Sequence, residues 1–150
     1  MDIHNYQSTC CNLLKNIEVE KGLYDYYENR INSNTILSKD DELLINYIIE
    51  NIDKNSKIIE IAAGLGQVSH YLKYNGFNNI TINECENKRY NLTKFLNDKL
   101  GNNCLLLKNF YQKIPLQNYD YIFTINGVSS HIGKLEELLI FEKLLNSGKK

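Results

Sequence analysis

The sequence predicts an α/β fold built around a parallel sheet. Short apolar, β-branched runs alternate with segments whose apolar residues recur at helical spacing, which is the pattern of βαβ units. A cluster of small residues follows the first of these runs, where a strand would turn into a helix. A length of 150 residues fits one domain that can bury a core without disulfide or metal support.

The N-terminal part predicts helices before any strand. Residues 12–17 and 23–31 each predict a short helix, and we assign residues 1–37 to a helical extension. Ser38 begins the next helix, and Asp41 three residues later makes a variant of the capping box. Within that helix, apolar residues recur at helical spacing at Leu43, Leu44, Tyr47, Ile48 and Ile52.

Four strands and three further helices follow within residues 38–150. The predicted strands cover residues 57–61, 79–83, 104–108 and 121–125. The predicted helices cover residues 66–74, 88–100 and 132–146, and Gly76 and Gly101 end the first two. Parallel strands joined through helices require right-handed crossovers, so the carboxyl ends of all four strands meet at one edge.

The composition excludes several classes of function. The formal net charge is −1, with 17 basic and 18 acidic side chains, so nucleic acid and anionic membranes are not expected partners. No apolar run approaches the roughly 20 residues of a membrane span, and the start has no signal-peptide layout. We therefore expect a cytoplasmic protein. Without CxxC spacing, reduced thiols and no metal site are expected for the four cysteines, Cys10, Cys11, Cys85 and Cys104.

The turn after the first strand predicts a ligand site. Ala62 and Ala63 are the only alanines of the chain, and they stand beside Gly64 and Gly66. Small residues let a backbone approach a ligand closely, and the following helix start supplies free N–H groups. A tight strand-to-helix turn without a ligand is the alternative.

The type of ligand follows from two neighbouring positions. A dinucleotide fingerprint needs a third glycine three residues after Gly64, where this chain has Gln67. Glu60, just before the turn, favours a ligand with a cationic group over a pyrophosphate. Both observations argue against a nicotinamide-dependent oxidoreductase, which we keep as a third hypothesis.

The segment Glu60-x-Ala62-x-Gly64-x-Gly66 resembles the first motif of the class I S-adenosylmethionine-dependent methyltransferases. The resemblance implies a Rossmann-like three-layer sandwich with a mostly parallel sheet, in which the four visible strands have the order 3-2-1-4. It also implies that this loop wraps the methionine portion of S-adenosylmethionine and that Glu60 interacts with it, usually through water. Ala62 stands where the family more often has its first glycine.

Further motifs extend the resemblance over about residues 38–150. Glu84 follows the second strand, where the family has an acidic residue that takes both ribose hydroxyls; independently, a carboxylate has two acceptor oxygens that match a vicinal diol. Glu86 competes for this role. Asn109 and Phe110 follow the third strand, where the family binds adenine. The predicted cofactor-binding residues are Glu60, Ala62, Ala63, Gly64, Gly66, Glu84, Cys85, Asn109, Phe110 and Asn126.

The methyl acceptor is constrained mainly by motifs that the sequence lacks. The exit of the fourth strand has no Asn/Asp-Pro-Pro-aromatic box, and the only proline, Pro115, is not followed by cysteine. Nucleic acid is thus the less expected substrate, and a small molecule is the expected one. His131 is the candidate general base, although a helix-start histidine capped by Ser130 is the favoured interpretation. The tyrosines at 24, 26 and 27 either cover the cofactor or pack against the sheet.

The family sheet has seven strands in the order 3-2-1-4-5-7-6, and this chain accounts for four. Either the chain is a fragment, or a short form covers strand four by forming homo-oligomers, or a partner chain supplies the remaining strands. We therefore expect a methyltransferase, or its cofactor-binding part, that transfers a methyl group to a small molecule and yields S-adenosylhomocysteine. The alternative is a non-catalytic subunit that binds the cofactor and regulates or stabilises a partner.

Overall fold

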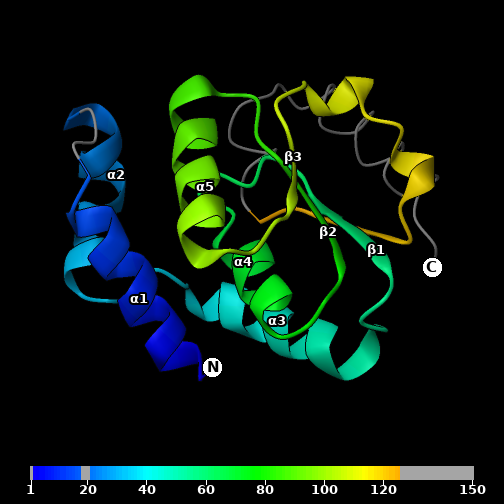
Figure 1. Cartoon of the computed structure of the whole chain (residues 1–150), viewed down its shortest axis with the longest axis horizontal. Coiled ribbons are helices and arrows are strands. Elements are labelled where there is room, and N and C mark those ends of the chain that lie inside the picture. The colour runs from blue at the N-terminus through cyan, green and yellow to red at the C-terminus, as the bar shows by residue number, and fades with distance from the viewer. Residues whose placement is uncertain (1, 18–20, 126–150) are drawn as a thin grey trace.

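The computed structural model describes residues 2–17 and 21–125, with side chains from residue 27 onward and in the first segment (Figure 1). Its centre is a four-stranded parallel sheet in the order β3-β2-β1-β4. The strands are β1 Lys57–Glu60, β2 Asn79–Asn83, β3 Leu105–Leu107 and β4 Tyr121–Phe123. The predicted α/β class and strand order are confirmed. The predicted helix over residues 132–146 lies outside the described residues.

Three helices cover one face of the sheet: α3 Lys39–Asn51, α4 Gln67–Tyr74 and α5 Asn87–Leu100. Figure 1 shows them together on one side of the strands, with the 3-10 turns η1 Tyr111–Lys113 and η2 Leu116–Asn118 away from them. Successive strand residues point to opposite faces. Ile58 therefore belongs to the larger core under the helices, whereas Ile59 joins a smaller core with Ile114 and Leu116.

The N-terminal helices α1 Ile3–Lys15 and α2 Lys21–Asn32 pack against each other, and α1 also contacts α5. The prediction of a helix over residues 12–17 was wrong about its start, because Asp2 caps the helix by accepting a hydrogen bond from the N–H of His4 at 3.2 Å. Tyr6, Cys10 and Leu14 lie one turn apart and are fully buried. Burial of this stripe in the main core holds the first turns of α1 in place.

The start of α3 confirms the capping box. The Ser38 hydroxyl accepts from the N–H of Asp41 at 3.1 Å, and Asp41 Oδ2 accepts from the N–H of Ser38 at 2.7 Å. The apolar residues that predicted this helix lie on two faces. Ile48 is buried, whereas Leu43 and Tyr47 are 61% and 60% exposed. The core-facing stripe instead runs through Asp41, Ile45 and Ile48, so a carboxylate is carried into the interior.

No two of the four cysteines pair with each other in the described part of the chain. Cys10, Cys11 and Cys104 are free and buried, and Cys85 is free and exposed. Within residues 2–17 and 21–125, no three metal-ligating side chains come together. The described helices also include none with the length and apolar content that crossing a bilayer requires.

Candidate functional site

The turn between β1 and α4 is a sharp bend at the carboxyl edge of the sheet. Three of its residues have positive φ angles: 52° at Ala62, 61° at Gly64 and 66° at Gly66. The N–H of Ala63 donates to the carbonyl of Asn83 at 2.9 Å, and the N–H of Gly66 donates to the carbonyl of Ala63 at 2.9 Å. The predicted strand-to-helix junction is therefore present, and it is tied to the end of β2.

Ala62 holds a backbone conformation that favours glycine. A left-handed alanine costs about 1 kcal/mol or more, because its Cβ crowds the following carbonyl oxygen. We expect Ala62→Gly to raise the free energy of unfolding by about 0.5–1 kcal/mol, measured by urea denaturation. The matched change Ala63→Gly, at a position without positive φ, should lower it by a similar amount. Equal effects of the two changes would contradict the strain at Ala62.

Gly66 is required by packing. It is the N-cap of α4, and a Cβ added there would lie 2.7 Å from Thr93 Oγ1 of α5 and 3.2 Å from two carbons of Ile82. Both neighbours are buried, so neither can move aside freely. The glycine brings α4 close to β2 and α5, and its role as a direct cofactor contact stays a prediction.

Gly64 connects the turn to the acidic residue after β2. Its N–H donates to Oε2 of Glu84 at 2.8 Å. The hydroxyl of Tyr27 lies 2.9 Å from the position that a Cβ on Gly64 would take. Tyr27 of α2 is buried in the main core with its hydroxyl beside the turn, and a covering role over the cofactor stays a prediction. The side chains of Tyr24 and Tyr26 lie outside the described residues.

Glu84, and not its competitor Glu86, lies at this turn. Glu84 is buried, its Oε1 accepts from the N–H of Glu86 at 2.9 Å, and its own N–H donates to the carbonyl of Leu107 at 3.1 Å. Glu86 is exposed and caps α5 by accepting from the N–H groups of Lys88 and Arg89. Cys85, between the two glutamates, is exposed.

Glu60 ends β1 beneath the turn and is 2% exposed. Its Oε2 accepts from the N–H of Ser69 at 3.3 Å. Burial raises the pKa of Glu60 to about 8; hydrogen bonds from Ser69 oppose this shift, and the nearby Asp41 and Glu84 carboxylates add to it. The predicted acidic residue is thus enclosed, with further carboxylates close to it.

Asn109 and Phe110 follow β3 at the same edge and are exposed, Phe110 at 60%. Sequence analysis missed Asn83, the last residue of β2. Its side-chain amide donates to the carbonyls of Leu107 and Asn109 at 3.1 and 2.7 Å, and so fixes the loop that carries the two predicted adenine contacts. The sequence signal that could have identified Asn83 was its position as a polar residue at the end of an otherwise apolar strand. The predicted Asn126 and His131 lie outside the described residues.

The donor and acceptor groups at this edge fit an adenosine-containing ligand. Each carboxylate oxygen of Glu84 accepts one backbone N–H. Because a carboxylate offers about four acceptor positions, two remain for the hydroxyls of a ribose. Gly64 has a positive φ and no Cβ, and the Tyr27 hydroxyl fills the space where a Cβ would lie, 2.9 Å from that position.

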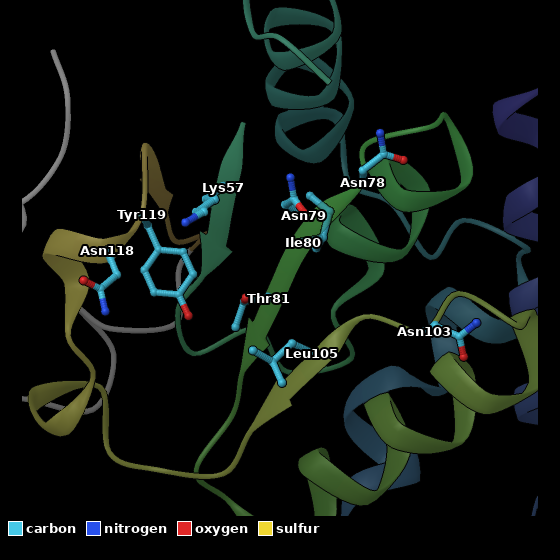
Figure 2. Close-up of a pocket in the computed structure, with 9 residues that line it drawn as sticks. All are labelled: Lys57, Asn78, Asn79, Ile80, Thr81, Asn103, Leu105, Asn118 and Tyr119. Atoms are coloured by element: carbon cyan, nitrogen blue, oxygen red, sulfur yellow. The ribbon is translucent and has the colours of Figure 1, made fainter. Parts of the chain in front are cut away.

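A cavity of about 350 Å³ lies at the opposite end of the strands (Figure 2). It is bordered by the first residues of β1, β2 and β3, and by Tyr119 just before β4. Figure 2 shows the ring of Tyr119 facing Thr81 and Leu105 across this space. In doubly wound sheets, ligands bind at the carboxyl ends of the strands, so this cavity is separate from the site at the glycine turn.

Neither family models nor curated proteins match this chain, whereas solved structures do. A magnesium protoporphyrin IX methyltransferase from Synechocystis PCC 6803, with bound SAM, is 11% identical with a TM-score of 0.66, covering 73% of this chain and 53% of its own. The plantazolicin methyltransferase BpumL, in complex with SAH, is 15% identical with a TM-score of 0.60. The match covers 98% of this chain and 55% of BpumL.

A SAM-dependent methyltransferase from Aquifex aeolicus is 18% identical with a TM-score of 0.53, covering 67% of this chain and 57% of its own. The chain thus spans about half the length of the solved structures that it matches. At these identities the likeness concerns the fold. The chain has the fold of the class I S-adenosylmethionine-dependent methyltransferases, as its motifs predicted.

Proposed function

We propose that the chain is an S-adenosylmethionine-dependent methyltransferase, or the cofactor-binding part of one, and that it acts on a small-molecule acceptor. The hydrogen bond from the N–H of Gly64 to Glu84 Oε2, at 2.8 Å, carries this proposal. It joins the two sequence motifs that the resemblance assigns to the methionine portion and to the ribose. Solved neighbours of the same fold contain SAM or SAH, which supports the choice of cofactor.

Each part of the edge has a task in this proposal. The cofactor, when bound, supplies the methyl group from its sulfonium. Glu84 orients the ribose, the turn at Gly64 lies against the methionine portion, and Glu60 provides negative charge beneath it. Asn109 and Phe110 contact the adenine. The protein then mainly positions the acceptor and excludes water, and His131 serves as a base only if the acceptor must lose a proton.

Calorimetric titration with S-adenosylhomocysteine tests the site. We expect Glu84→Gln to weaken binding at least about tenfold, because an amide nitrogen cannot accept either a ribose hydroxyl or the N–H of Gly64. The matched change Glu86→Gln should leave the affinity within about twofold, since Glu86 caps α5 away from the turn. Unchanged binding in Glu84→Gln, or equal losses in both variants, would contradict the assignment.

A non-catalytic cofactor-binding subunit is the second candidate. It is favoured by the residues assigned at this edge within the described part of the chain, which all serve cofactor binding. Under that proposal the isolated chain binds the cofactor and transfers no methyl group to any acceptor, which a radiolabelled methyl-transfer screen would test. Failure of NAD and NADP to bind would exclude the oxidoreductase hypothesis.

The remaining assignments belong to the same proposal. Residues 1–37 form an N-terminal covering segment, and residues 38–150 form the cofactor-binding domain. The expected partners are a small-molecule acceptor and, at the β4 edge, a second copy or a separate chain, and the expected location is the cytoplasm. Support for the covering segment comes from Tyr27, whose hydroxyl lies over Gly64.

A further inference from the structure

Three carboxylates are buried together beneath the glycine turn. Asp41, Glu60 and Glu84 are 1%, 2% and 3% exposed, and they come from α3, the end of β1 and the end of β2. Taking three ionised carboxylates out of water without cations is costly. No cationic side chain is among the described groups that shift the pKa of Glu60.

The surroundings of Glu60 contain acidic groups on several sides. The titratable groups that interact with it are Tyr6 of α1, Asp41 of α3, Glu84 after β2 and Cys104 before β3. From α4, the N–H of Ser69 donates a hydrogen bond to its carboxylate. Each of these titratable neighbours is neutral or negative in its usual states, so none compensates a negative charge on Glu60.

One buried carboxylate oxygen in this region, Oδ1 of Asp41, lacks a hydrogen-bond partner in the described structure. The other oxygen of Asp41 accepts from the N–H of Ser38 and, at 3.4 Å, from the side-chain amide of Gln67 at the start of α4. Buried polar atoms are normally satisfied, so an unpaired acceptor in an acidic cluster indicates that a hydrogen-bond donor is missing. A cationic ligand group supplies both donors and charge.

We infer that cofactor binding at this turn is coupled to the release of one proton from Glu60. This inference rests on the proposed function. Without ligand, Glu60 retains its proton because Asp41 and Glu84 would otherwise make the cluster strongly negative. The α-ammonium of S-adenosylmethionine or S-adenosylhomocysteine brings a positive charge to the cluster, Glu60 ionises, and its proton passes to the solvent. The ionised carboxylate then attracts the ammonium directly.

Calorimetry in two buffers of different ionisation enthalpy measures this proton. At about pH 7, titration of the whole chain with S-adenosylhomocysteine should release between about half and one proton per ligand, and the affinity should rise up to about tenfold per pH unit between about pH 6 and pH 8. Glu60→Gln, an uncharged variant of the same shape, should bind without proton release and without this pH dependence.

A second ligand makes the test independent of any variant. 5′-Methylthioadenosine contains the same nucleoside and sulfur but lacks the amino-acid portion, so it should bind the wild-type chain without releasing a proton. Binding of S-adenosylhomocysteine with no proton exchange, or equal release with both ligands, would overturn the inference while leaving the proposed function intact. If neither ligand produces a heat of binding with the folded chain, the proposed function is overturned and the inference with it.

Discussion

Gly66→Ala is expected to lower the free energy of unfolding by about 3 kcal/mol. About 1 kcal/mol comes from placing a side chain at a φ of 66°, and the remainder from crowding within a packed interior. The added Cβ would lie 2.7 Å from Thr93 Oγ1 and 3.2 Å from Ile82, and both residues are buried. Urea denaturation followed by circular dichroism measures the loss.

Gly101→Ala is the control for the backbone contribution alone. Gly101 has a φ of 65°, and an added Cβ would meet no atom within 4 Å. Gly101→Ala should lower the free energy of unfolding by only about 1 kcal/mol. Combining Gly66→Ala with Thr93→Ala should cost less than the sum of the two single changes, because the second removes the atom that the first collides with. Equal losses at Gly66 and Gly101 would show that Gly66 is not a packing position.

The stability of the protein is expected to fall as the pH rises from about 6.5 to 8, and Glu60→Gln should remove most of that fall. Burial raises the pKa of Glu60 from its ordinary 4.5 to about 8 in the folded chain. Between these values the folded state binds more protons than the unfolded state, so raising the pH favours unfolding. Over about 1.5 pH units, at about 1.4 kcal/mol per unit, the loss is about 2 kcal/mol.

The lower limit of this window is set by His70. Burial lowers the pKa of His70 to about 4, so between about pH 4.5 and 6.5 its unfolded form binds a proton that the folded form does not; this cancels the contribution of Glu60 and leaves the stability nearly independent of pH there. Urea denaturation at a series of pH values measures the slope above about pH 6.5 and the plateau below it. Glu50→Gln, at an exposed site on α3, should leave the slope unchanged. If the dependence of stability on pH is the same in Glu60→Gln as in the wild type, a group other than Glu60 causes it.

The sequence predicted the sheet and the turn well because their signals are local. Short apolar runs predicted all four strands, and the concentration of small residues at 62–66 predicted the bend at the end of β1. Glu84 was preferred over Glu86 because it directly follows a strand, and the structure places it against Gly64. Periodicity and position along a strand were sufficient for these assignments.

The parts that sequence analysis missed depend on contacts between distant segments. Asp41 was recognised as part of a cap, but its proximity to Glu60 follows from how α3 packs beside α4. Asn83 appeared to be an ordinary strand end, although its amide fixes the loop after β3. The early start of α1 depends on burial of Tyr6 and Cys10 in a core formed by residues far along the chain.

The anchoring of α1 restricts how a ligand reaches the turn. The Tyr6 hydroxyl donates to the carbonyl of Gln67 at 2.6 Å, and its ring meets that of Tyr71 edge-on with centroids 5.0 Å apart. Swinging α1 outward would break this bond in the interior and expose the side chains around it to water, at a cost of several kcal/mol. Displacement of the Tyr27 side chain leaves the Tyr6 anchor intact, so we expect a ligand to reach the turn past Tyr27 while α1 stays in place.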